Sequence, residues 1–173
     1  MKEIQVQFSK TKIIFTIIGS LLFVVIGVWF LINFTELQTS FSLVLIKIAG
    51  VVSILFFGTT MFYWIKKYFD KKPGLIINKY GIIDNSSGTS VGLIEWNDIT
   101  RIRIIEIMRT KSILLDTDKP EKYIAKAKPF QAKIMRANMK MYGTPLSIAP
   151  QTLQMPFDEL NDLLFEQIYL NKQ

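Results

Sequence analysis

Two long apolar runs dominate the N-terminal half of the chain. Residues 13–34 and 43–65 are almost continuously apolar, and the short polar segment 35–42 connects them. A helix needs about 20 apolar residues to cross the hydrocarbon core of a bilayer, which is roughly 30 Å thick. The pattern therefore predicts a transmembrane hairpin, since the connection is too short to hold a domain and returns the chain to the side it came from.

After Pro73 and Gly74 the pattern changes to short runs that are typical of β-strands. These runs combine β-branched and other apolar side chains with turns rich in Gly, Asn and Ser. They are residues 75–78, 82–84, 91–96, 99–107, 112–116, 146–148 and 153–155. We therefore expect a small β-sandwich or open barrel.

Helical spacing replaces the strand pattern in two places. A helix is predicted to start with Asp118 as its N-cap and Pro120 in its first turn, and to end at Gly143. Pro129 makes this region either two helices or one kinked helix. Apolar residues fall on one helical face: Tyr123, Ala127, Phe130, Ile134, Ala137 and Met141. A final helix carries an apolar stripe formed by Phe157, Leu160, Leu164 and Ile168.

Taken together, these elements predict a membrane α-hairpin followed by an α+β domain. We expect residues 1–72 to form the two-span hairpin with its short flanks, and residues 73–173 to form the domain. The count and order of the elements favour a pleckstrin-homology-like (PH-like) fold, with a helical insertion and a C-terminal capping helix.

Composition removes most catalytic chemistry. The chain has 173 residues and a net charge of +7, and it contains neither Cys nor His. Thiol chemistry, disulfides, an imidazole base and His metal ligands are therefore excluded. We expect no catalytic residue, no metal site, no cofactor and no enzymatic activity.

The lysines predict the orientation of the hairpin. Lys10 and Lys12 precede the first apolar run, whereas the connection carries only Glu36. Positively charged flanks stay in the cytoplasm, so both termini should be cytoplasmic in a bacterial inner membrane. Lys47 lies near the outer end of the second run, where its ammonium can extend to the headgroups. The alternative for Lys47 is a role in a pore or a helix contact.

Basic residues give the clearest functional signal. Four follow the second run: Lys66, Lys67, Lys71 and Lys72. Five more lie along the first predicted helix of the domain: Lys122, Lys126, Lys133, Arg136 and Lys140. Each set would attract anionic lipid headgroups or an acidic partner. The alternatives are a topology signal for the first set and a solvated helix face for the second. Nucleic acid is not expected, because aromatic residues are not interleaved with the basic ones.

Turn residues complete the pattern of the domain. Gly81, Gly92 and Gly143 are predicted to occupy turns that need positive φ. Trp96 is expected to be a core or rim aromatic residue, and Asp84 and Asp98 are expected to be turn residues.

Several of these blocks resemble a bacterial family of two-pass inner-membrane proteins with a cytoplasmic PH-like domain. The blocks are residues 73–77, 81–85, 91–99, 143–148 (which includes Pro145) and 157–160. The resemblance extends over almost the whole chain and implies the fold and topology above, without an enzymatic activity. Some toxin-immunity proteins resemble the same family.

These observations predict a non-enzymatic, membrane-anchored module that binds a protein partner or lipid headgroups at the cytoplasmic face. One alternative is an immunity protein that neutralises a membrane-acting toxin from another bacterium. A second is a ligand-gated effector that disrupts the membrane when its spans assemble into an oligomer.

Overall fold

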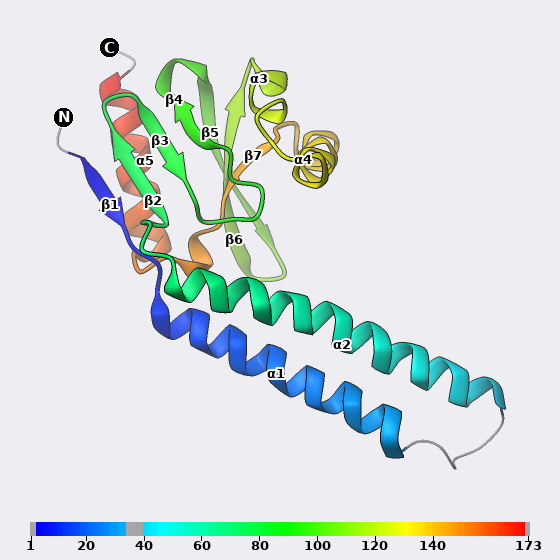
Figure 1. Ribbon diagram of the computed structural model, residues 1–173. Helices are drawn as coiled ribbons and strands as arrows, with labels where there is room; N and C mark the ends of the chain where they lie inside the picture. Colours follow the sequence, from blue (N-terminus) through cyan, green and yellow to red (C-terminus); the bar gives the residue numbers. More distant parts are fainter. Residues whose placement is uncertain (1–2, 34–39, 172–173) are drawn as a thin grey trace. The chain divides into compact units, whose positions relative to one another are not determined.

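We analysed a computed structural model of the chain, which describes residues 3–33 and 40–171. The chain divides into two compact units (Figure 1). Lys10–Lys71 form the first unit, the hairpin. Met1–Ser9 and Lys72–Gln173 together form the second unit, the β domain. The expected turn at residues 35–42, including Glu36, lies largely outside the described residues.

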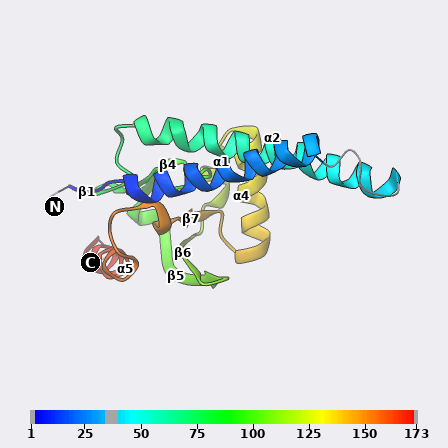
Figure 2. The ribbon, with the colours of Figure 1, turned by 90° about the horizontal axis from the view of Figure 1, so that it is seen from below.

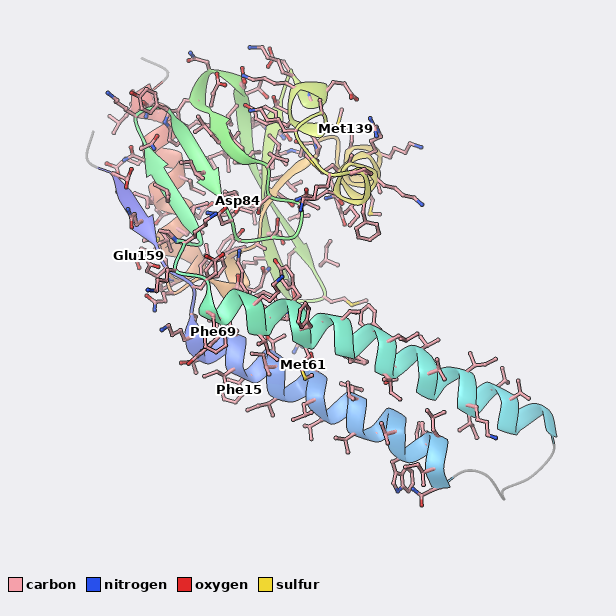
Figure 3. The ribbon with its side chains drawn as sticks, viewed as in Figure 1. Phe15, Met61, Phe69, Asp84, Met139 and Glu159 are labelled. Atoms are coloured by element: carbon pink, nitrogen blue, oxygen red, sulfur yellow. The ribbon has the colours of Figure 1, made fainter. Side chains whose placement is uncertain are left out.

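The hairpin consists of helix α1 (Lys10–Asn33) and helix α2 (Ser40–Phe69). Both helices are long and apolar enough to cross a membrane, judged by length and composition. Their large apolar side chains point outward, as Figure 3 shows for Phe15, and Leu55 is also exposed. A helix of a soluble protein would bury such side chains against a core, so this pattern is typical of a helix surrounded by lipid.

Small residues bring α1 and α2 together. A side chain at Gly27 would meet the Gly50 carbonyl oxygen at 3.0 Å, so neither position has room for one. The Ser53 hydroxyl donates a hydrogen bond of 3.2 Å to the Phe23 carbonyl across the same contact. Close backbone approach of this kind is what drives helix association where all surroundings are apolar.

The first sheet of the β domain has four antiparallel strands in the order β1-β2-β3-β4. They are β1 (Ile4–Val6), β2 (Leu75–Asn78), β3 (Gly81–Asp84) and β4 (Gly92–Glu95). Strand β1 differs from expectation, because the sequence placed residues 1–12 with the hairpin as a polar flank. The strand contains too few residues to show a period, and its pairing with β2 is a long-range contact.

The second sheet has three antiparallel strands in the order β5-β6-β7. They are β5 (Ile99–Ile107), β6 (Thr110–Thr117) and β7 (Leu146–Ile148). A bulge between Ile99 and Arg101 shifts the register of β5. It explains why Ile99 and Ile102, three positions apart, are both buried.

Short helical elements connect the strands. They are η1 (Trp96–Asp98), α3 (Pro120–Ile124), α4 (Pro129–Tyr142) and η2 (Pro150–Thr152). The chain therefore uses two helices, rather than one kinked helix, around Pro129. The cap at Asp118 was predicted wrongly: Lys119 is the N-cap of α3, and no side chain caps it. The strand at 153–155 was also wrong, since only Leu153 forms an isolated bridge, to Phe8.

Helix α5 (Phe157–Asn171) lies along the four-stranded sheet. Glu159 near its start lines a pocket together with Gln5, and Asn171 at its end lines another with Lys79. Leu160 and Leu164 are fully buried, as the apolar stripe predicts. Helices α4 and α5 lie on opposite sides of the strands in both views (Figures 1 and 2).

Candidate functional site: the outer face of helix α4

The lysines after the second apolar run all lie at the end of α2 or just beyond it. The Lys66 ammonium lies 5.3 Å from the centroid of the Phe62 ring, and the Lys67 ammonium lies 3.9 Å from an Asp70 carboxylate oxygen. Lys71 and Lys72 are exposed. This segment therefore keeps a cluster of positive charge close to the apolar part of the helix, and Asp70 is the one acidic residue in the sequence of positions 66–72.

The sequence grouped Lys122 with the helical cations, but the structure places it in an internal ion-pair network. Asp98 is 1% exposed and forms the centre of this network. Its carboxylate accepts hydrogen bonds from the Lys119 ammonium at 2.6 Å and from the Lys122 ammonium at 2.5 Å. The Tyr123 hydroxyl donates a third, at 2.8 Å, and Lys122 also donates to Glu95 at 2.7 Å.

These contacts stabilise the charged forms of Asp98 and Lys122 and the neutral form of Tyr123. The hydrogen bond from Lys119, followed by that from Lys122, holds the pKa of Asp98 well below its ordinary value. The hydrogen bonds to Asp98 and then Glu95 raise the pKa of Lys122. Burial, reinforced by the bond to Asp98, raises the pKa of Tyr123 to about 12. Lys119 and Lys122 therefore hold α3 against Asp98 in the segment that follows β4, and Lys122 also holds it against Glu95 at the end of β4. Their charges are matched within the fold.

The other predicted cations of this region point outward. Lys133, Arg136 and Lys140 lie on α4 and are exposed, and Arg136 makes only a long contact of 3.9 Å to the exposed Glu121. Lys126, between α3 and α4, lies 5.1 Å from the centroid of the Tyr123 ring. The structure thus keeps three of the five predicted residues together on one helix and separates Lys122 from them.

The apolar residues of α4 are exposed as well. Phe130 is 77% exposed and Met141 is 69% exposed, and Ile134 and Ala137 between them are also exposed. With spacings of four, three and four residues, these positions form a single stripe along the helix. We call these four residues the α4 outer face. Basic residues border this face along one side, because each lies one residue before a member of the stripe: Lys133, Arg136 and Lys140.

The opposite side of α4 packs against the β domain. Met135 is fully buried and Ala132 is nearly so. The Gln131 amide donates hydrogen bonds of 2.8 Å and 3.1 Å to the Gly88 and Ser90 carbonyls. Figure 3 shows α4 from its end, near the labelled Met139, with side chains projecting away from the strands. The helix therefore docks through the side that carries Ala132 and Met135, and the apolar stripe on its other side is exposed.

An arginine on β5 holds the C-terminal end of α4. The Arg103 guanidinium donates two hydrogen bonds to the Asp116 carboxylate, at 2.7 Å and 2.6 Å, and a third to the Tyr142 carbonyl at 2.6 Å. The pair with Asp116 raises the pKa of Arg103. Gly143 then ends the helix with a φ of 80°, the left-handed conformation common at this position.

The predicted turn residues serve the fold. Gly81, Gly92 and Gly143 all have positive φ, as expected. At Gly81 a side chain would collide with the Ile94 carbonyl oxygen. The buried Trp96 donates a hydrogen bond of 2.8 Å to the Asn78 carbonyl and is a core aromatic residue, as predicted.

Three further residues of the expected motifs are also structural. Gly74 packs against Leu153, and Pro145 is buried at the start of β7. Asp84 is buried and accepts hydrogen bonds from the Ser86 and Ser90 hydroxyls, at 2.6 Å and 2.8 Å, which close its loop. Lys47 of the hairpin is exposed on α2.

Sequence reasoning missed the partners that fix these elements, namely Lys119, Glu95, Arg103 and Asp116. None of the four stood out locally, since β5 holds Arg101 and Glu106 besides Arg103. They are joined by contacts between residues far apart in the chain, which spacing along one element does not reveal.

No protein-family model matches the chain, and neither a curated protein nor a solved structure matches it.

Proposed function

We propose that this protein is a non-enzymatic binding module, anchored in the bacterial inner membrane by α1 and α2, whose β domain works at the cytoplasmic surface. One observation carries the proposal. Strand β1 pairs with β2, although the whole hairpin lies between them in the chain. The backbone groups of one sheet pair on one side of a membrane, so a chain that crosses after β1 must cross back before β2. This pairing supports a two-pass anchor.

Connectivity also supports a PH-like assignment for the β domain. Seven strands form sheets of four and three, and a C-terminal helix follows them. In this reading the hairpin is an insertion between the first and second strands. The domain is then joined to its anchor at two points of the chain, before Lys10 and after Lys71, and both connections are short.

The absence of enzymatic activity is proposed from chemistry. The chain has no His or Cys. Among the residues that the structure describes, the two buried carboxylates, Asp84 and Asp98, accept hydrogen bonds from serine and lysine partners within the fold. A general acid or base would instead need a pKa near the working pH, and the pKa of Asp98 is lowered. We propose that the domain acts by binding, through the α4 outer face and its basic border.

Membrane fractionation and topology reporters test the anchor. We expect the full chain to stay in the membrane pellet through an alkaline carbonate wash. A fluorescent protein fused after residue 173 should be bright, and alkaline phosphatase fused at the same position should be inactive, because phosphatase folds only outside the cytoplasm. Release by carbonate would refute the anchor, and an active phosphatase fusion would refute the orientation.

A further inference from the structure

The strongest unexplained feature of the β domain is the α4 outer face. Its members Phe130, Ile134 and Met141 are large apolar side chains, yet they lie in solvent. We infer that this face inserts into the headgroup region of an anionic lipid bilayer. The inference rests on the proposed function, since it names the partner that the anchored domain binds.

The composition of α4 matches a helix that lies in a membrane surface. It contains three basic residues, Lys133, Arg136 and Lys140, and no acidic residue. Helices that bind in this way combine an apolar face with basic residues beside it, because the apolar side chains enter the acyl boundary and the cations meet lipid phosphates. The border of the α4 outer face thus complements an anionic surface and would repel a basic partner.

The exposure of this face does not arise from a poorly docked helix. Near the start of α4, the Gln131 side chain donates hydrogen bonds to two carbonyls of the β domain. At the end of α4, Arg103 donates a hydrogen bond to the Tyr142 carbonyl. Met135 is fully buried between them. These contacts fix the rotation of α4 about its own axis, so the outer face is presented by a rigid element and needs no rearrangement before binding.

The connection to the hairpin makes a modest affinity sufficient. Helix α2 ends at Phe69 and β2 begins at Leu75, so few residues separate the anchor from the domain. In an anchored chain, binding of α4 to the same bilayer is intramolecular and occurs at a high effective concentration. A short amphipathic helix that would bind vesicles weakly on its own can then remain bound.

A second copy of the chain is the competing occupant. Helix α5 carries acidic residues, among them Asp162 and Glu166, and could meet the basic border of α4 in another molecule. Such a contact would join two different surfaces, and it would extend into open chains unless the rotation happened to close. A bilayer can cover the α4 outer face of every copy in the same way, without forming open chains, so we favour lipid as the partner.

Single-cysteine labelling of the full chain tests this inference, since the native sequence has no Cys. The environment-sensitive fluorophore NBD would be attached at Met141→Cys in α4, at Glu166→Cys in α5 as a matched exposed control, and at Leu55→Cys in α2 as a reporter of the span. Each protein is placed in nanodiscs of phosphatidylcholine with or without phosphatidylglycerol. Doxyl-labelled phosphatidylcholine is the quencher, with its nitroxide near the headgroup for the domain labels and deeper in the chain for Leu55.

We expect quenching at Met141→Cys in discs that contain phosphatidylglycerol, and little at Glu166→Cys in either lipid. Neutralising the border with Lys133→Gln or Lys140→Gln should lower the ratio of bound to free α4 about fivefold each. Both lysines are exposed, so these variants should fold normally.

Three results would overturn the inference. In the first, Met141→Cys stays unquenched while Leu55→Cys is quenched, which leaves the anchor intact. In the second, neither label is quenched, and the proposed function fails as well. In the third, emission at Met141→Cys shifts to the blue without quenching, and only in discs that hold two copies, which assigns the α4 outer face to a second copy.

Discussion

Helices α4 and α5 are both amphipathic and nearly equal in length, with 14 and 15 residues, yet the β domain uses them in opposite ways. Helix α5 buries the centre of its apolar stripe at Leu160 and Leu164, and its charged residues are all acidic. Helix α4 exposes its apolar stripe, and its charged residues are all basic.

The contrast shows that amphipathic spacing identifies an apolar face without identifying what covers it. For α5 the cover is the domain's own sheet. For α4 the domain covers the side around Met135, whereas Phe130, Ile134 and Met141 stay exposed. Charge separates the two helices further, because an anionic surface attracts the border of α4 and repels α5.

The largest expected effect concerns stability. Leu164→Ala in α5 and Met135→Ala on the inner side of α4 should each lower the free energy of unfolding by about 2–5 kcal/mol, since both remove fully buried side chains. Phe130→Ala on the outer face should change it by about 0.5 kcal/mol or less. Urea unfolding of the full chain in nanodiscs, followed by circular dichroism, measures all three. A large loss with Phe130→Ala would mean that the α4 outer face is covered within the fold.

A smaller loss of stability is expected when the buried charge of Asp98 is removed. Asp98→Asn removes the acceptor shared by Lys119, Lys122 and Tyr123, and should cost about 1–3 kcal/mol at neutral pH.

The pH dependence of this loss has a defined sign. The folded pKa of Asp98 lies below its unfolded value of about 3.9, so the unfolded chain binds more protons between the two pKa values. The stability from Asp98 is complete above about pH 5 and is lost as the pH falls towards the folded pKa. Asp98→Asn should therefore flatten the acid side of the stability curve. Asp162→Asn, at an exposed carboxylate, is the control, and an equal change in both variants would contradict this role.

The smallest effects are expected from the solvent faces of the two helices. Lys140→Gln in α4 and Glu166→Gln in α5 should each change the free energy of unfolding by about 0.5 kcal/mol or less. Their effects on lipid binding should differ, since the first weakens the α4 contact about fivefold and the second leaves it nearly unchanged. Added salt should reduce the effect of Lys140→Gln on lipid binding, because salt screens exposed charges. Equal effects of the two variants on quenching would remove the distinction between the helices.

The sequence alone determined the elements whose signal is local. Two apolar runs specify α1 and α2, since twenty successive apolar side chains have few other uses. The strands from β2 to β7 follow from β-branched runs between turn residues. The break at Pro129 was visible as well, although whether it bent one helix or separated two was not.

Tertiary structure decided everything that depends on contacts between distant residues. Strand β1 exists because Ile4–Val6 meets β2 after the entire hairpin has intervened. Lys122 became part of the fold because Asp98 lies within reach of it, whereas Lys140, with the same chemistry, stayed outside. The rotation of α4 was set in the same way by Gln131 and Arg103. A sequence period locates a face on a helix, but only the partners that dock the helix determine whether that face points to the core or to the surroundings.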